Sequence, residues 1–414
     1  MSRIAVVGGG IAGMGAAWLL SRRHEVTLFE ANDYLGGHTH THDIELHGRR
    51  HAVDTGFIVF NPQHYPLLTR LFVELGVASQ PTTMSFSVSD ERNGLEYNAG
   101  DLRGLFCQPG NVVSPRFWRM LADLARFYRQ APALLERPDD AIALGDYLRA
   151  HGYSDVFRDD HLVPMASALW SSPARRILDF PAAHLVRFMH NHHMLQLTGR
   201  PQWRVVSGGS QSYVRALRMQ WQVEERLDSA VSSVLRDDGG VRIAGAFGEM
   251  RFDNAVLACH PDDALALLGD ADPAERRILG ALAYQDNEAV LHTDARVMPR
   301  NRHAWAAWNA HVPATADAAC SVSYWMNALQ SLDTSEPLIV SLNREGIDPR
   351  RILRRMRYRH PLQTVESVRA QACRRDIQGR RGTWFAGAGW GFGFHEDGLR
   401  SGVEVANALG VPWP

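Results

Sequence analysis

The first sixty residues alternate between short apolar runs and glycine-rich turns. Residues 3–7 (RIAVV) are apolar and β-branched, which predicts a buried strand. A glycine-rich turn follows, then apolar residues at helical spacing to about residue 23, and then a second strand over residues 25–30. This order predicts a strand, helix and strand unit that starts at residue 3. Residues 53–60 (VDTGFIVF) predict a further strand.

The pattern becomes helical between about residues 62 and 200. Apolar positions recur there at helical spacing, with proline and glycine at the joins, as in the series Phe117, Leu121, Leu124, Phe127 and Tyr128. Residues 205–214 return to a glycine-rich turn that opens a helix, and residues 227–258 hold several short strands. Residues 262–375 read as mixed structure. A strand over 383–386 and a helix over 399–409 are predicted to end the chain.

Composition narrows the class of protein. The chain has 414 residues, 45% hydrophobic and 21% charged, which fits a globular protein with two cores. A net charge of −1 gives no overall field that would attract nucleic acid, so no nucleic-acid partner is expected. Four well-separated cysteines argue against a disulfide framework or zinc ribbon and fit a cytoplasmic location. Residues 4–20 lack the basic flank of a signal peptide and are too rich in glycine for a span.

Lysine is missing from the composition altogether. All 44 residues counted as Lys or Arg are arginine. A Schiff base, a lysine nucleophile and a P-loop lysine are therefore excluded.

The first glycine turn has the spacing of a dinucleotide-binding motif. Gly8, Gly10 and Gly13 follow the first strand and open the helix, and Glu30 ends the next strand. Glycines at this spacing let the backbone approach a pyrophosphate at the helix N-terminus, while the acid accepts hydrogen bonds from the ribose hydroxyls. An acid there disfavours the extra phosphate of NADP.

Further motifs resemble, in order, the FAD-dependent amine oxidase and phytoene desaturase superfamily. They are the Gly36-Gly37 pair, the SGGS turn at 207–210, the LDSAVSSV stretch at 227–234 and the segment TWFAGAGWGFGFHEDGLRSG at 383–402. The resemblance implies an α/β fold with a Rossmann-type FAD-binding domain and a second, α+β substrate domain. It implies an FAD domain in three segments, 1–61, 201–261 and 376–414, with a helical substrate segment at 62–200 and a mixed-sheet one at 262–375.

The same resemblance implies which residues surround FAD. The family places the glycine pair beside the diphosphate, a valine of the middle strand at the adenine, and the N-terminus of the last helix toward the flavin pyrimidine, where it stabilises the charge of the reduced ring. The residues implied in addition to the first turn are Gly36, Gly37, His38, Val231, Gly387, Gly398 and Leu399.

The run LGGHTHTH raises a second interpretation. On a strand His38, His40 and His42 would project from one face, as metal ligands must. However, the family commonly has an arginine where His38 stands, and no carboxylate cluster completes a ligand set. We therefore expect this run to lie along the flavin and to bind no metal.

More narrowly, GGHTHT, VDTGFIVFN, HLVPMASALWSSP, NEAVLHTD and GFGFHEDGLRSG resemble a bacterial subfamily of amine oxidase-like proteins. That subfamily is often encoded beside cyclopropane fatty-acyl-phospholipid synthase-type methyltransferases, which suggests lipid modification and a methyltransferase partner. Two features depart from the superfamily: Ala388 replaces the acid that usually follows the last strand's glycine, and no lysine exists to hold a water at flavin N5. Amine oxidation of that form is therefore disfavoured.

Candidates for the chemistry come from the turn before the last helix. His395 and Glu396 are predicted at the flavin edge, with His395 as acid or base, although a structural hydrogen bond is as good an interpretation of the histidine. Trp390, Phe392 and Phe394 alternate on this turn and are predicted to form an apolar substrate slot, or else to pack in the core.

We therefore expect an FAD-dependent oxidoreductase that acts on an apolar substrate, an unsaturated or methylated fatty acyl chain, free or in a phospholipid. The alternatives are an amine or amino-acid oxidase, a non-redox flavin isomerase or hydratase, and a flavin-binding partner of a lipid methyltransferase. The basic segment from Arg350 to Arg359 reads as a helix, which would either be solvated or contact anionic lipid at the inner face of the membrane.

Overall fold

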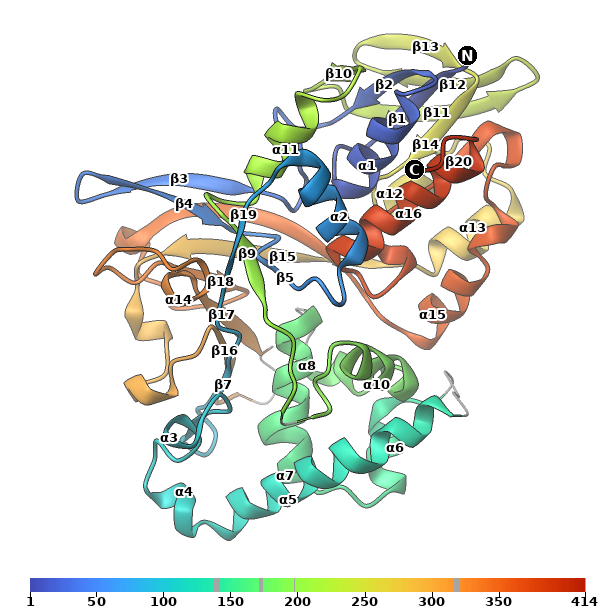
Figure 1. The fold of residues 1–414 in the computed structure, drawn as a ribbon. Helices are drawn as coiled ribbons and strands as arrows, with labels where there is room; N and C mark the ends of the chain where they lie inside the picture. The colour runs from blue at the N-terminus through green and yellow to red at the C-terminus, as the bar shows by residue number, and fades with distance from the viewer. Residues whose placement is uncertain (137–141, 171–173, 197, 316–319, 414) are drawn as a thin grey trace.

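A five-stranded parallel sheet carries the N-terminal glycine turn (Figure 1). The computed structural model describes residues 1–136, 142–170, 174–196, 198–315 and 320–413. The sheet has the order β10 (Val223–Arg226), β2 (Glu25–Phe29), β1 (Arg3–Val7), β14 (Asn254–Leu257) and β20 (Thr383–Phe385). Its strands come from both ends and the middle of the chain.

Side chains that alternate across this sheet form two cores. Ile4 and Val6 pack with one set of helices, and Ala5 and Val7 pack with elements on the other face. The first face is covered by α1 (Ile11–Leu20), α2 (Pro66–Leu75), α11 (Gln211–Arg218) and α16 (His395–Ala408). The second is covered by β11 (Val231–Asp237), β12 (Gly240–Gly245), β13 (Gly248–Phe252), α12 (Pro261–Leu267), α13 (Pro273–Gly280) and α15 (Val365–Ala372).

The part that we predict to bind substrate, called the substrate part below, is built on a seven-stranded mixed sheet. Its order is β19 (Ile352–Pro361), β15 (Tyr284–His292), β18 (Ile339–Leu342), β17 (Ser321–Trp325), β16 (Trp308–Val312), β7 (Phe86–Asp90) and β8 (Leu95–Asn98). Only β16 and β7 pair in parallel among these described strands. Helix α14 (Met326–Gln330) follows β17.

The predicted helical part lies beside this sheet (Figure 1). Its helices are α3 (Leu102–Leu105), α4 (Gly110–Val113), α5 (Pro115–Gln130), α6 (Leu144–Ala150), α7 (Asp155–Phe157), α8 (Val163–Trp170), α9 (Ala174–Ile177) and α10 (Ala182–Asn191). Smaller strands join the parts: the hairpin of β3 (Thr41–Leu46) with β4 (Arg49–Asp54), and the sheet of β5 (Val59–Phe60), β9 (Arg204–Val206) and β6 (Ser79–Pro81).

Three sequence predictions differ from the structure. The basic segment is an edge strand, β19, not a helix, because Met356 and Tyr358 alternate into a core shared with β15. Residues 53–60 are divided between β4 and β5, because a Cβ on Gly56 would lie 2.2 Å from the His38 carbonyl oxygen, so the chains pass too closely for a regular strand. The last helix begins at His395, four residues before the predicted start.

Within the described residues, no helix combines the length and the apolar character needed to cross a membrane.

Candidate active site

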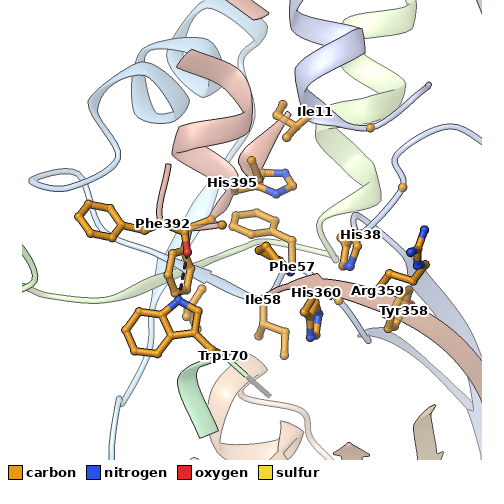
Figure 2. A pocket seen from close by; sticks show the side chains of 18 of the residues that line it. Ile11, His38, Phe57, Ile58, Trp170, Tyr358, Arg359, His360, Phe392 and His395 are labelled. Atoms are coloured by element: carbon orange, nitrogen blue, oxygen red, sulfur yellow. Dashed lines mark hydrogen bonds between the residues drawn. The ribbon is translucent and has the colours of Figure 1, made fainter. Parts of the chain in front are cut away.

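A cavity of about 1130 Å³ connects the glycine turn with the helical part. One end is lined by Gly8, Gly10, Glu30 and Val231. The other end lies among aromatic and apolar side chains of the substrate part. Figure 2 shows its middle, where His395 lies over Phe57.

The first glycine turn is shaped by close backbone contacts. Gly8 has φ of 106°, and a Cβ there would lie 2.9 Å from the Ala258 carbonyl oxygen. A Cβ on Gly13 would lie 1.9 Å from the Gly8 carbonyl oxygen, so this glycine lets α1 pack against the strand. A Cβ on Gly10 would meet nothing within 4 Å, and Gly10 lines the cavity. The N-terminus of α1 therefore faces open space with no capping side chain.

Glu30 lies at the end of β2 beside this turn. Its Oε2 accepts a hydrogen bond from the Gly9 N–H at 2.7 Å, and its Oε1 accepts from the N–H of Asn32 at 2.9 Å. A carboxylate offers about four acceptor positions, so Glu30 retains capacity for a ribose hydroxyl. Val231 lines the same end of the cavity.

The second glycine pair touches the first turn. The Gly36 N–H donates to the Gly9 carbonyl at 2.8 Å, and a Cβ on Gly37 would lie 3.2 Å from Gly10 Cα. Both line the cavity, with φ of 128° and 56°. Two glycine turns thus form one wall, where a diphosphate can approach the backbone.

Of the histidine run only His38 lines the cavity. Its ring lies 5.1 Å from Tyr358 and 5.3 Å from His360, and burial holds its pKa well below the ordinary value, so the imidazole is neutral (Figure 2). The prediction that all three imidazoles run along the cofactor is wrong. Strand β3 begins only at Thr41, and the rings of His40 and His42 contact each other in a tilted arrangement with centroids 4.1 Å apart.

His395 is the first residue of α16 and lines the middle of the cavity. Its Nε2 lies 2.8 Å from the Tyr213 hydroxyl and 3.1 Å from Thr39 Oγ1, and its ring stacks on Phe57 with centroids 3.9 Å apart. Burial lowers its pKa to about 3. The side chain is therefore a neutral, fixed imidazole whose Nδ1 makes no hydrogen bond within the described residues.

Glu396 does not share this position. Its two carboxylate oxygens accept from the Leu67 and Leu68 N–H groups, each at 3.0 Å, at the N-terminus of α2. It is 4% exposed and is not among the residues lining the cavity. The prediction of a catalytic Glu396 is corrected: its carboxylate stabilises the start of α2.

Of the three residues near the last helix that were predicted to contact FAD, one lines the cavity and two do not. Gly387 lines the cavity with φ of 148°. Gly398 and Leu399 do not: a Cβ on Gly398 would lie 2.8 Å from Ile11 Cγ2, and Leu399 is fully buried in the core of α1 and α16. These two residues pack the helices together.

Two of the three aromatic residues lie where the predicted substrate slot requires them. Phe392 and Phe394 line the cavity, and the Trp170 indole N–H donates to the Phe392 carbonyl at 3.1 Å (Figure 2). Trp390 instead packs against the core on the second face of the five-stranded parallel sheet, with the Arg374 guanidinium 5.5 Å from its ring. Its prediction as a substrate residue is therefore corrected.

Beyond Phe392 and Phe394 the cavity continues as a compartment that we call the apolar compartment. Its other apolar or aromatic lining residues are Met84, Phe86, Tyr128, Met165, Leu169, Trp170, Phe188, Trp308, Tyr324 and Leu342. Burial lowers the pKa of His161 and His192, which also line it, to about 4, so both are neutral. Among the described lining residues the only carboxylates are Glu30 and Asp263, both at the dinucleotide end.

Sequence reasoning missed Thr39, Tyr213 and Phe57, which orient His395. Each comes from a stretch that the sequence had singled out, namely the histidine run, the SGGS helix and VDTGFIVF. The sequence motifs pointed to these three stretches. They could not predict that the three side chains contact His395, because these contacts join segments that lie far apart in the sequence. Cys259 and His260 also line the cavity, yet burial raises the Cys259 pKa to about 12, so it is no thiolate nucleophile.

These features fit FAD. The two glycine turns leave room for a diphosphate at an uncapped helix N-terminus, Glu30 and Val231 border the far end, and the N-terminal turn of α16 borders the middle. Contact of each of these residues with FAD remains a prediction.

Comparison with known proteins agrees with this geometry. The family described as flavin containing amine oxidoreductase matches residues 11–284. No curated protein sequence matches the chain. Among solved structures, a CLA-producing fatty acid isomerase from P. acnes is 17% identical with a TM-score of 0.69, over 99% of this chain and 98% of that one.

Two amine oxidases are similar in fold. Cyclohexylamine oxidase from Brevibacterium oxydans is 16% identical with a TM-score of 0.68, and putrescine oxidase is 14% identical with a TM-score of 0.69. Each alignment covers 99% of this chain and 98% of the other. The protein therefore belongs to the flavin-containing amine oxidoreductase family, and it is an FAD-dependent oxidoreductase.

Proposed function

We propose that this oxidoreductase acts on a fatty acyl chain, unsaturated or methyl-branched, either free or within a phospholipid. The observation that carries the proposal is the apolar compartment, which no described carboxylate lines. Bound FAD supplies a two-electron acceptor or donor for chemistry on such a chain.

The compartment provides binding energy of the kind that a hydrocarbon uses. A methylene transferred from water into it gains about 0.8 kcal/mol. Phe188 and Phe394 stack with ring centroids 4.9 Å apart, and together with Phe392 and His395 they line the cavity. A chain threaded along these rings would be desolvated where it meets His395.

The charges favour an acyl chain over an amine. An ammonium group in this compartment would have no described carboxylate partner, and burying an unpaired charge is costly. The exposed Arg200 lines the compartment and can pair with a carboxylate or phosphate head group. The chain also has no lysine to hold a water beside the flavin.

The isomerase likeness supports the same substrate class. That protein acts on a fatty acid by its name, although 17% identity shows a shared fold alone. It also makes a second candidate reaction worth testing, the movement of a double bond without net oxidation. Association with a lipid methyltransferase is a separate proposal that co-purification of the two proteins would test.

A chain-length series tests the proposal. Holoenzyme is titrated with saturated fatty acids of increasing length, and binding is followed by the flavin absorbance. We expect the dissociation constant to fall roughly fourfold per methylene until the compartment is filled. Leu169→Trp should shorten the longest chain that still gains affinity, whereas the volume-matched Leu169→Met should not. A dissociation constant that does not depend on chain length would contradict the proposal.

A further inference from the structure

Helices α3 and α4 lie at the end of the substrate part that is far from the N-terminus (Figure 1), and exposed apolar side chains gather on them and on α5. Leu102 on α3 is 74% exposed, Val112 and Val113 on α4 are 51% and 79% exposed, and Trp118 on α5 is 50% exposed. We call these four residues the apolar tip. Half of the eight large apolar side chains that the described surface exposes lie in this one stretch of seventeen residues.

The apolar tip is a fixed surface and not a set of unrelated side chains. The Trp118 indole N–H donates to the Val112 carbonyl at 2.8 Å. The Trp118 ring lies 5.7 Å from Phe106, whose N–H donates to the Leu102 carbonyl at 3.1 Å. These contacts hold α3, α4 and the start of α5 together with their apolar side chains outward. Large apolar side chains kept in water at this density mark a binding surface.

The exposed charged side chains along residues 101–119 are three arginines, Arg103, Arg116 and Arg119, and one acid, Asp101. Residues 102–122 contain three arginines and no carboxylate. Arg103 hydrogen-bonds His303, and the partners of Arg116 and Arg119 are Asp160 and Asp123, which are buried, so the guanidinium groups form the outer face. Asp101, the exposed acid beside α3, accepts from the Gly104 N–H and caps that helix.

The apolar tip is connected to the proposed substrate site. Ala99 and Gly100 line the cavity and lead directly to α3, and Tyr128 lines the cavity from the same helix that carries Trp118. The cavity lining therefore includes residues just before α3 and near the far end of α5, two of the helices that bear the apolar tip.

We propose that the apolar tip docks on an anionic lipid bilayer, so that acyl chains enter the compartment from the membrane. Apolar side chains that insert among the head groups, with arginines beside them, are the features of an interfacial contact. This docking is separate from the contact predicted for Arg350 to Arg359, which stays a prediction. The entry of substrate rests on the proposed function, whereas the docking does not.

Vesicle sedimentation of the holoenzyme tests the docking. Vesicles of phosphatidylcholine with phosphatidylglycerol are compared with vesicles of phosphatidylcholine alone. We expect binding to the anionic vesicles that weakens as salt rises from about 0.15 to 1 M, because the screening length falls from about 8 to 3 Å. Val113→Asp with Trp118→Ser should reduce binding by about tenfold or more. Arg103→Gln should reduce the dependence on salt.

The matched control is Val73→Asp with Met219→Ser, because these residues are 77% and 81% exposed but lie outside the apolar tip. This control should bind vesicles as the unchanged protein does. Flavin content and melting temperature of each variant show that it is folded. Equal binding by the tip variant and the unchanged protein would overturn the docking, as would a dimer in solution that Val113→Asp dissociates, since a second copy would then occupy the tip.

The docking and the proposed function fail separately. Reduction of the flavin by a short, monomeric acyl substrate should be the same in the tip variant and in the unchanged protein. Acyl turnover without vesicle binding would contradict the docking alone. Vesicle binding without chemistry on any acyl chain would support the docking and contradict the proposed function.

Discussion

We expect the imidazole of His395 to act as a hydrogen-bonding group, because burial lowers its pKa to about 3 and leaves little of the protonated form that a general acid needs. The Tyr213 hydroxyl and Thr39 fix its Nε2, and Phe57 fixes the plane of its ring. Its Nδ1 has no partner among the described residues and can meet a ligand. A neutral imidazole can still accept a proton, so the low pKa disfavours only the general-acid part of the role that the sequence suggested.

The role of His395 is testable through substitution and pH. His395→Ala should retain FAD and slow the reaction with substrate by about tenfold, the worth of one hydrogen bond in the transition state. The rate of the unchanged protein should show no histidine ionisation between pH 5 and 9. Stopped-flow flavin absorbance measures both. A rate that depends on a group of pKa near 6.5, with the dependence lost in His395→Gln, would restore an acid or base role.

Glu30 carries a prediction about cofactor affinity. Glu30→Gln preserves the size of the side chain but turns an acceptor oxygen into a donor that can face the Gly9 N–H. We expect the dissociation constant for FAD to rise by about tenfold or more, since a hydrogen bond to a charged group is worth about 1.5–3 kcal/mol. Titration of the apoprotein by flavin fluorescence measures it. An unchanged constant would remove Glu30 from the cofactor site.

At the scale of elements, α16 packs on α1 through glycine. A Cβ on Gly402 would lie 2.3 Å from the Ala12 carbonyl oxygen, and backbone cannot yield as a flexible side chain can. Gly402→Ala should therefore destabilise the protein by about 1–3 kcal/mol and weaken FAD binding, because α1 and α16 both border the cavity. The control is Gly280→Ala in α13, where the nearest atom to a Cβ lies 3.7 Å away.

Urea denaturation and FAD titration of both variants decide this prediction. If Gly402→Ala is as stable as Gly280→Ala, the packing of the two helices does not position the site.

The local pattern of apolar residues and glycines predicted the strands and the helix around the first glycine turn. It failed for elements whose structure depends on residues far away in the sequence. β1, α1 and β2 lie within a few residues of their predicted limits, because each has its own periodicity and glycine boundaries. β19 was misread as a helix, because its register is set by β15 about seventy residues earlier. The start of α16 was missed because the Asp397 carboxylate accepts from the Phe394 N–H, a cap hidden in a glycine-rich stretch.

The residues of the site also separate into those that local sequence features predicted and those that depend on long-range packing. Gly8, Gly10 and Glu30 line the cavity, as the spacing of their motif predicted, and Gly36 and Gly37 line it as the family resemblance implied; their contact with FAD stays a prediction. The partners of His395 and the different positions of Trp390 and Phe392 depend on how remote segments pack, and sequence spacing does not contain that information.

For the whole molecule, buried neutral histidines predict sensitivity to acid. Burial lowers the pKa of His161 to about 4 and those of His184 and His395 to about 3. Below the unfolded pKa of 6.5 the unfolded chain binds protons that the folded protein does not bind, so stability falls as pH falls. Between its unfolded and folded pKa values, each such histidine lowers the free energy of unfolding by roughly 1.4 kcal/mol for each pH unit of acidification. Asp54 and Asp397, whose pKa burial raises to about 6, oppose this in part between about pH 6 and 4.

The free energy of unfolding from urea titrations between pH 7 and 5 measures the effect. We expect a decrease over this interval and a smaller one in His184→Leu, because the Nε2 atom of His184 is buried without a hydrogen-bond partner. Stability that stays constant or increases toward pH 5 would show that the imidazoles are solvated.

The central claim is that the apolar compartment selects an acyl chain, and a matched pair of ligands tests it most directly. Oxidised holoenzyme is mixed without oxygen with an unsaturated fatty acid or with the primary amine of the same chain, and photoreduced enzyme is mixed with the acid. Flavin absorbance is followed and the lipid products are analysed by mass spectrometry. The account predicts a changed acyl product, by oxidation, reduction or double-bond movement, and no reaction of the amine. Rapid bleaching of the flavin by the amine, with the acid unchanged in both redox states, would contradict it.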